Sequence, residues 1–208
     1  MKYPLIFLLG ILTSANLLLA GNSQADDLLI DAQGSLLAIG LADSLSSNTT
    51  DFALARYLAD GSLDSTFNPN GLVPGILQIE LPQPVAAANQ LLEETNQGLV
   101  SAKIDAFGGI VAVGFSTVGL ISQMAVVKLN RDGSLDRLFN ANGLLGPTPG
   151  LALLNVGQIR SASNDTNNFT SDRAAGVALD SQGRIVVAGT SDTGQNLELI
   201  TVRLLPDG

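Results

Sequence analysis

The sequence predicts an all-β fold, a β-propeller-like array of antiparallel meander repeats. The first observation is a set of markers that returns in a fixed order from Asp31, Asp105 and Asp180, which are 74 and 75 residues apart. Each begins an Asp-x-x-Gly turn, and an apolar run ending on glycine follows it. The second is that every unit carries hairpin turns rather than the short rungs of a β-helix. Ordered markers at a near-constant period define a repeat architecture, and hairpin-rich units favour a propeller over a solenoid.

The third unit shows the predicted strands most clearly. Residues 176–180 form a short apolar strand, and Gly183 supplies the left-handed conformation of the following turn. Residues 184–188 are rich in β-branched side chains, which favour a second strand. A polar loop leads to a third strand at residues 197–205. One such sheet cannot bury both of its faces, so neighbouring units must stack.

The first two units continue beyond the third strand. Phe67-Asn-Pro-Asn-Gly71 and Phe139-Asn-Ala-Asn-Gly143 each end in an Asn-Gly turn signal. The apolar residues 72–79 then predict a fourth strand, which Pro74 and Gly75 place at a sheet edge or break. Insertions at residues 81–98 and 146–172 lengthen these units, and we expect them on one rim of the array. The first insertion predicts a short helix at residues 85–94, and the second a polar loop at residues 161–168.

The N-terminal segment predicts a secretory signal peptide. Lys2 precedes an apolar stretch, and small residues follow it, with cleavage expected after Ala25 and Ala20 as second choice. An uncleaved membrane anchor is the alternative, which Thr13, Ser14 and Asn16 disfavour by interrupting the apolar stretch. No later stretch is apolar enough to span a membrane, so we expect an extracytoplasmic protein: periplasmic, cell-surface or secreted. The expected organisation is a signal peptide at residues 1–25, unit 1 at 26–98, unit 2 at 99–172 and a partial unit 3 at 173–208.

The composition excludes several kinds of function. The 208 residues carry a formal net charge of −9, which repels phosphate backbones and makes nucleic acid an unsuitable partner. The chain has no Cys and no His, which removes thiol nucleophiles, disulfides, the Ser-His-Asp triad and His-ligated metals. Carboxylates, Lys, Tyr or a hard metal held by oxygen atoms remain as chemical options.

These motifs resemble the bacterial delta-60 repeat, a β-propeller-like module of secreted and surface proteins. The resemblance rests on the Asp-x-x-Gly hairpins, on Phe52-Ala-Leu-Ala-Arg56 and its counterpart ending at Lys128, and on the Asp-Gly-Ser-Leu-Asp turns from Asp60 and Asp132. It covers most of the chain after the leader. The units here are longer than the family name implies, and Lys128 replaces the usual Arg. The resemblance implies an extracytoplasmic propeller; it does not imply an established activity or catalytic residues.

Two recurring constellations invite a functional interpretation. Asn130, Asp132 and Asp136 have the oxygen spacing of a calcium loop, but Leu58 and Leu205 stand where Asn130 has its counterparts. We therefore expect the aspartates to cap turn amides.

Arg56, Lys128 and Arg203 recur on one strand of each unit. They suggest either a ring of cations that binds a ligand or structural ion pairs with Asp64, Asp136 or their neighbours. Recurrence in every unit favours the ion pairs, because each unit solves the same packing problem.

Unrepeated acidic pairs are the remaining candidates for acid–base chemistry. Glu93-Glu94 and Asp26-Asp27 are adjacent in sequence, and adjacent side chains on a helix or strand point apart. We expect both pairs to be solvated surface charges. Three glycosylation sequons are expected to be turn-forming loops; they begin at Asn48, Asn164 and Asn168.

The expected function is that of a non-catalytic structural or interaction module with no catalytic, cofactor-binding or metal-binding residues and no cofactor. Its partner would be an unknown protein or glycan bound by rim loops. The alternative is a propeller-based carbohydrate-active enzyme, a lyase or glycosidase using loop carboxylates. The third unit stops at Asp207-Gly208, inside its turn motif. Propellers typically have about 4–8 blades, so we expect this array of about 2.5–3 units to be open and to self-associate through its end blades, or to be a fragment of a longer protein.

Overall fold

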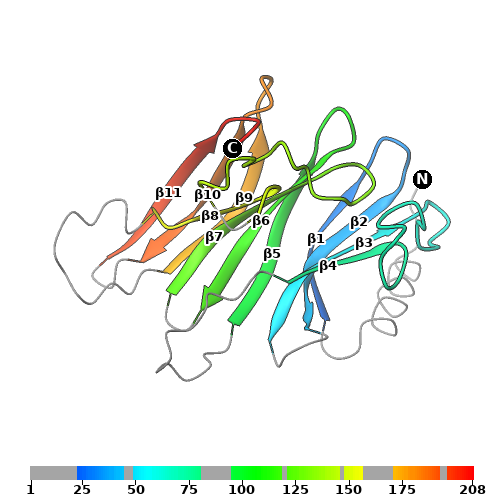
Figure 1. The fold of residues 1–208 in the computed structure, drawn as a ribbon, viewed down its shortest axis with the longest axis horizontal. Coiled ribbons are helices and arrows are strands. Elements are labelled where there is room, and N and C mark those ends of the chain that lie inside the picture. The colour runs from blue at the N-terminus through cyan, green and yellow to red at the C-terminus, as the bar shows by residue number, and fades with distance from the viewer. Residues whose placement is uncertain are drawn as a thin grey trace, which may run out of the picture.

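The computed structural model describes residues 23–44, 49–80, 95–118, 121–145, 148–156, 171–192 and 196–208. These residues form an all-β molecule whose strands lie side by side largely in chain order, from β1 at one end to β11 at the other (Figure 1). The strands are β1 (Ser23–Ile30), β2 (Leu36–Asp43), β3 (Thr50–Tyr57), β4 (Ile76–Ile79), β5 (Thr95–Ile104), β6 (Ile110–Val118), β7 (Ile121–Leu129), β8 (Leu151–Leu154), β9 (Ser171–Leu179), β10 (Ile185–Asp192) and β11 (Leu197–Leu204).

The strands group into three units of the same topology. The meanders β1–β2–β3, β5–β6–β7 and β9–β10–β11 are antiparallel throughout, and β4 and β8 pair antiparallel with β3 and β7. Unit 1 and unit 2 are therefore four-stranded, and the described part of unit 3 is three-stranded. Single parallel bridges join the units, from Thr50 to Asn96 and from Ser122 to Ser171. The predicted all-β array of meander repeats is confirmed.

The Asp-x-x-Gly turns have the predicted conformation in all three units. Gly34, Gly108 and Gly183 have φ angles of 83°, 85° and 74°, a region that favours glycine. In each turn one aspartate oxygen accepts hydrogen bonds from two backbone amides, as Asp31 does from Gln33 and Ser35. The carboxylate and the glycine together fix the hairpin that connects the first two strands of each unit.

The glycine at the end of each apolar run also has a structural cause. The first strand of every unit carries a β-bulge opposite this glycine. A Cβ atom on Gly40, Gly114 or Gly189 would overlap with a carbonyl oxygen of that bulged strand. Only glycine permits this close approach of two backbones.

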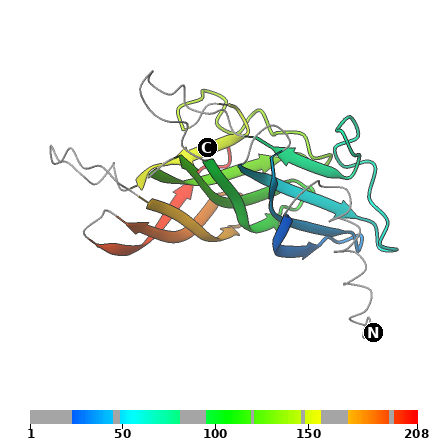
Figure 2. The same cartoon turned by 90° about the horizontal axis from the view of Figure 1, so that it is seen from below.

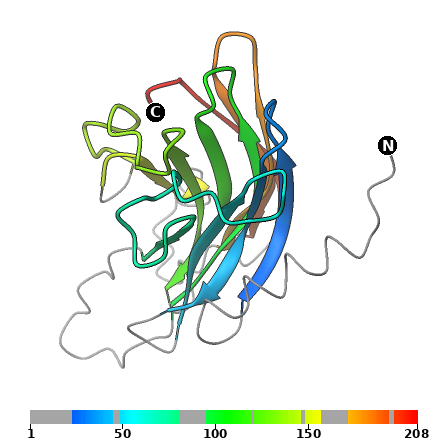
Figure 3. The ribbon, with the colours of Figure 1, turned by 90° about the vertical axis from the view of Figure 1, so that its right-hand side faces the viewer.

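Two hydrophobic cores lie between the units. The first joins Phe52 and Leu54 of unit 1 to Leu99, Ile110 and other residues of unit 2. The second joins unit 2 to unit 3 and contains Met124, Val126 and Ile185. Both 90° views show the curl that brings neighbouring units together (Figure 2 and Figure 3). The expected stacking of one unit on the next is therefore what buries the apolar faces.

The first strands begin earlier than their sequence pattern indicates. β1 begins at Ser23, β5 at Thr95 and β9 at Ser171, because the bulge inserts a residue and interrupts the alternation on which the prediction depended. β4 is shorter than expected and begins directly after Gly75, at the edge of its sheet. β8 had no counterpart in the prediction.

Several predictions concern residues outside the described part of the chain. They are most of the leader, the helix at residues 85–94 and the polar loop at residues 161–168. Ser23, Gln24 and Ala25 pair with β2. Cleavage after Ala25 would remove these three paired residues, whereas cleavage after Ala20 would leave β1 whole. Within the described ranges, no helix has the length and hydropathy that a membrane crossing requires.

Candidate functional site at the junctions between units

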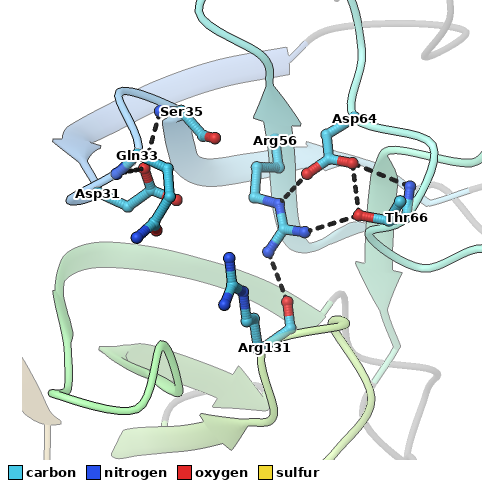
Figure 4. A network of polar contacts seen from close by, with 7 residues as sticks. All are labelled: Asp31, Gln33, Ser35, Arg56, Asp64, Thr66 and Arg131. Carbon is cyan, nitrogen blue, oxygen red and sulfur yellow. Dashed lines mark hydrogen bonds and ion pairs between the residues drawn. The ribbon is translucent and has the colours of Figure 1, made fainter.

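The recurring cation of unit 1 lies at its junction with unit 2. Arg56 extends from β3, and its Nε donates a 2.7 Å hydrogen bond to Asp64 Oδ2 (Figure 4). A second guanidinium nitrogen donates to Thr66 Oγ1 at 3.1 Å, and a third donates to the backbone oxygen of Arg131 in unit 2. The guanidinium thus joins two side chains of its own unit to the main chain of the next.

Asp64 is held in its charged form although it is buried. Only 8% of its side chain is exposed. Burial alone would raise the pKa of the carboxyl, but hydrogen bonds from the Thr66 hydroxyl and amide and the Arg56 guanidinium outweigh burial and lower the pKa below its ordinary value. Asp64 and Arg56 therefore form the structural ion pair that the sequence predicts.

The same junction is packed around a phenyl ring. The Arg56 guanidinium carbon lies 4.9 Å from the centre of the Phe67 ring, and Phe67 is fully buried. Gly133 of unit 2 also lies against this ring, since a Cβ atom on it would come within 2.8 Å of a ring carbon. Asn68, at a φ of 47°, donates its backbone N–H to Asp132 O at 2.7 Å. The Asp-Gly turn of unit 2 is thus docked on unit 1.

The junction between units 2 and 3 repeats this arrangement. Lys128 Nζ lies 3.1 Å from Asp136 Oδ2 and donates to the backbone oxygen of Pro206 at 2.7 Å. Asn140, with a φ of 49°, donates its N–H to Asp207 O at 2.7 Å. Pro206 and Arg131 occupy equivalent positions. The next unit contributes a backbone oxygen to the contact, so the contact does not depend on which side chain stands at that position.

The third recurring cation has a different environment. Arg203 on β11 is exposed, and among the described residues it has no ion-pair partner. The predicted ion pairs are therefore confirmed for Arg56 and Lys128, and for Arg203 the prediction stays untested. The three cations do not form a common ligand-binding ring, because the first two are bonded within separate junctions.

The Asp-Gly-Ser-Leu-Asp turns use their carboxylates to close the turns. Asp60 and Asp132 each accept from the amide and the hydroxyl of the serine two residues later, and these bonds lower the pKa of both carboxyls. Asp136 accepts from the Leu138 amide through its other oxygen. The predicted role in capping turns is confirmed. Within the described ranges, Asp and Glu side chains do not gather in a group of three that could hold a metal ion.

A small cavity lies where the hairpin turns of units 1 and 2 meet. Its volume is about 140 Å³, and its lining includes Asp31, Gln33, Arg56, Asp105, Phe107 and Arg131. The Arg131 side chain points toward the space between Gln33 and Arg56 (Figure 4). Arg131 and Phe107 have no equivalents in the other units, where Ala59 or Pro206 replaces Arg131. The lining of this cavity therefore differs from the equivalent positions of the other units.

The sequence analysis missed the burial of two aspartates, Asp51 and Asp172. Asp51 on β3 is 3% exposed, and its Oδ2 accepts a 3.0 Å hydrogen bond from Gln78 on β4. Burial raises its pKa, with a further increase from the Glu80 charge, against hydrogen bonds from Ser44 and Gln78 that lower it. Gln123 occupies the equivalent position in unit 2 and Glu198 the equivalent position in unit 3, so a carboxylate does not recur in every unit. No regular pattern of residue types marks Asp51 as buried.

Of the two predicted acidic pairs, the structure describes Asp26-Asp27. Asp26 is exposed and accepts from Gln24, as expected of a surface charge. The prediction is wrong for Asp27, which is half-buried because its Oδ2 accepts the backbone N–H of Ala102 on β5 at 3.1 Å. Glu93 and Glu94 lie outside the described residues, as do the sequon asparagines Asn48, Asn164 and Asn168.

Comparison with known protein families agrees with this architecture. The family model of a domain of unknown function (DUF5122) β-propeller matches residues 34–67, 108–139 and 181–208. Each match begins in or just after the first hairpin turn of a unit, and the first two end at Phe67 and Phe139. The third match reaches Gly208. A comparison with curated proteins gave no match.

Proposed function

We propose that this β-propeller-type repeat chain is a non-catalytic structural and interaction module that works outside the cytoplasm, of the delta-60 kind. The observation that carries the proposal is the use of its recurring charged residues. Arg56, Asp64, Lys128 and Asp136 are bonded to one another and to neighbouring units, which leaves them no free group for chemistry. Such a framework supports binding by the parts that differ between units.

The unrepeated groups favour binding at the junction of units 1 and 2. The cavity there offers the Arg131 guanidinium and the exposed ring of Phe107 beside backbone turns. A cation and an aromatic ring that line one cavity suit a protein or glycan ligand that carries a carboxylate. The net charge of −9 argues against nucleic acid as the partner.

A carbohydrate-active enzyme is the second candidate, and Asp51 is the observation in its favour. A buried carboxyl with a raised pKa beside a second carboxylate is the arrangement that general acid catalysis uses. Against it, Asp51 is almost fully buried and bonded to Gln78 between two strands. It is not part of the junction cavity.

An activity panel with one variant separates the two functions. The purified chain is expected to leave glycosides and acidic polysaccharides unchanged. Turnover that is lost in Asp51→Asn and kept in Asp43→Asn would establish the enzyme instead. Binding to a glycan or peptide array should weaken in Arg131→Ala but not in Arg137→Ala, an arginine outside the cavity lining.

The extracytoplasmic location has its own test. The full-length protein is expected in the periplasm, on the cell surface or in the medium after expression in a bacterial host, with a new N-terminus revealed by Edman sequencing. Cleavage after Ala20 would preserve the pairing of Ser23 with Ala42, whereas cleavage after Ala25 would remove it. Protein found only in the cytoplasm with Met1 retained would contradict the location.

A further inference from the structure

The cavity between the hairpin turns of units 1 and 2 contains a cation that the junction leaves available. The backbone oxygen of Arg131 accepts from Arg56, but among the described residues its guanidinium has no hydrogen bond or ion pair. Its side chain lies against the hairpin glycine of its own unit, where a Cβ atom on Gly108 would come within 3.1 Å of the Arg131 Cδ atom. Figure 4 shows the guanidinium directed toward the space between Gln33 and Arg56. The cavity therefore has a positioned positive charge with no bonded counter-ion.

Two carboxylates of the same lining each have an oxygen atom to spare. Asp31 and Asp105 accept their two turn amides through Oδ1 alone. In unit 3 the second oxygen of the equivalent Asp180 accepts from the guanidinium of Arg184, but the residue four positions after the aspartate is not basic in units 1 and 2. Within the described part of the chain, the Oδ2 atoms of Asp31 and Asp105 therefore remain acceptors that a ligand can use.

An exposed aromatic ring completes the lining. Phe107 is 89% exposed, whereas glutamine occupies the equivalent positions, Gln33 and Gln182. A phenyl ring in this place offers a flat apolar face to a ligand. The cavity volume of about 140 Å³ is well below the roughly 300–1,000 Å³ of pockets that enclose a drug-sized ligand. The cavity can therefore hold one ring or one end group of a larger ligand.

These groups together require a ligand that carries one carboxylate and several hydrogen-bond donors. A guanidinium pairs with a carboxylate through two parallel hydrogen bonds, and the free aspartate oxygens accept from hydroxyl groups. A phosphate would bring a second negative charge toward the two aspartates. A peptide C-terminus offers one backbone N–H beside its carboxylate, which is one donor for two acceptors. A sugar acid supplies the carboxylate, several hydroxyl groups and an apolar C–H face on a single ring.

From this donor and acceptor set we infer, resting on the binding role proposed above for this cavity, that the ligand is a terminal uronic acid residue of a glycan. The Arg131 guanidinium donates to the uronate carboxylate, and the Oδ2 atoms of Asp31 and Asp105 accept from ring hydroxyl groups. The ring of Phe107 lies against the C–H face of the sugar. The net charge of −9 favours a single uronate over a polyuronate chain, because each further carboxylate would approach an acidic protein.

The junction between units 2 and 3 provides an internal comparison. Pro206 stands there in place of Arg131, and Gln182 in place of Phe107. The hairpin aspartate of unit 3 is already bonded to Arg184. That junction therefore lacks the cation, the ring and one of the two acceptors, and it is not expected to bind a uronate.

Titrations of the full chain with small probes, followed by amide NMR spectra at neutral pH, test the ligand class. Methyl β-D-glucuronide is expected to shift the amide resonances of Gln33 and Gly108, which belong to the two hairpins of the cavity lining. The methyl ester of this glucuronide lacks the charge, and cyclohexanecarboxylate lacks the hydroxyl groups. Each of these two probes should bind about tenfold more weakly. N-acetyl-alanyl-alanine, which supplies a peptide C-terminus, should also bind more weakly than the glucuronide.

Two variants give unit 2 the residues of the other units, so they are expected to fold as the wild type does. Arg131→Ala introduces the residue that unit 1 has at Ala59 and keeps the backbone contact with Arg56. It should weaken glucuronide binding about tenfold and leave the binding of the methyl ester unchanged. Phe107→Gln should weaken the binding of both by about threefold. Arg137→Ala, at an exposed arginine outside the lining, is the matched control, and thermal melts check the fold of each variant.

Ser35→Arg tests the hydroxyl contacts separately. Ser35 occupies the position of Arg184, so an arginine there is expected to bond the free oxygen of Asp31 as Arg184 bonds Asp180. Methyl glucuronide would then lose one hydroxyl contact that cyclohexanecarboxylate never makes. The ratio of the two affinities should therefore fall, whatever the added charge does to both. An unchanged ratio would show that Asp31 does not bind the sugar.

The outcomes separate the ligand class from the binding role of the cavity. A peptide carboxylate that binds in an Arg131-dependent way, while the glucuronide does not, would overturn the uronic acid and keep the cavity as a binding site. Equal binding of the glucuronide and its methyl ester would overturn the pairing of Arg131 with the carboxylate. If no probe shifted the cavity amides up to its solubility limit, both the uronic acid and the proposed use of this cavity would be overturned.

Discussion

The two junctions of the array perform the same docking with different cations. At the first, Arg56 makes three hydrogen bonds, and its side chain and that of Asp64 are 10% and 8% exposed. At the second, Lys128 and Asp136 are each 19% exposed, and the ammonium has two polar partners. The cation lies 4.9 Å from the Phe67 ring in the first junction and 5.9 Å from Phe139 in the second.

This difference shows which contact is required for docking. Both cations reach a backbone oxygen of the following unit, while the additional bond to Thr66 exists only where the cation is Arg. The residue equivalent to Thr66 is Leu138, which is 78% exposed and bonds through its backbone amide. The planar guanidinium fork of arginine has more N–H donors than the ammonium of lysine. The first junction uses these additional donors, and its ion pair is less exposed to solvent.

The largest expected effect is the removal of one cation at a time. Arg56→Met keeps the apolar stem but leaves the Asp64 carboxylate buried without its counter-charge, which should cost about 3 kcal/mol of unfolding free energy. Lys128→Met leaves Asp136 partly solvated and should cost about 1 kcal/mol. Urea denaturation measures both. Equal losses would show that the two junctions do not differ in the way their exposure indicates.

Replacing a turn glycine by alanine should cost more stability in a turn that is docked at a junction than in a hairpin turn. Gly133→Ala introduces strain at positive φ and a clash with Phe67, which should cost about 2–3 kcal/mol. Gly183→Ala has the same strain but meets only Pro206 at 3.7 Å, so about 1 kcal/mol is expected. Thermal melts of the two variants measure the difference. If Gly183→Ala were the worse of the two, the docking of the turn on Phe67 would contribute little.

Exchanging the cations should have a smaller effect. Arg56→Lys loses the bond to Thr66 and part of the contact with Asp64, for an expected cost of about 1 kcal/mol. Lys128→Arg should be within about 0.5 kcal/mol of the wild type, because the more exposed site has room for the fork. Denaturation midpoints at one pH decide this. A stabilising Arg56→Lys would refute the fork as the reason for arginine.

The smallest expected effect is on the pH dependence of stability. The two buried aspartates of β3 and its turn should change it in opposite directions. The pKa of Asp64 is below its ordinary 3.8, so its contribution to stability is present above that pH and is lost as the pH falls through the folded value. The pKa of Asp51 is raised, so its contribution is present below pH 3.8 and is lost as the pH rises through the folded value. Melting temperatures between pH 3 and pH 7 should therefore fall less steeply in acid for Asp64→Asn and more steeply for Asp51→Asn than for the wild type.

The repeat made much of the fold predictable from the sequence. Gly183 and its equivalents marked the hairpins, and the spacing from Arg56 to Asp64 indicated the ion pair, because both are local relations within one unit. The partner of Arg56 in unit 2 was not predictable, since a backbone oxygen leaves no mark on residue type. The burial of Asp51 was also missed, because the equivalent residues are Gln123 in unit 2 and an exposed Glu198 in unit 3. The bulges were not predicted, although the recurring glycines opposite them, Gly40 and its equivalents, are the residues that the bulges require.

The docking of each turn on the unit before it imposes an order on biosynthesis. Arg56 receives its inter-unit contact from a residue 75 positions later, and Lys128 from one 78 positions later. At roughly 5–20 residues per second, a ribosome needs about 4–15 s to deliver each missing turn. Until then the nascent chain exposes the side of its newest unit that packs on the following unit. A chaperone that binds this side for a few seconds would protect each unit from aggregation until the next unit covers it. The unit synthesised last would always be the one exposed to aggregation.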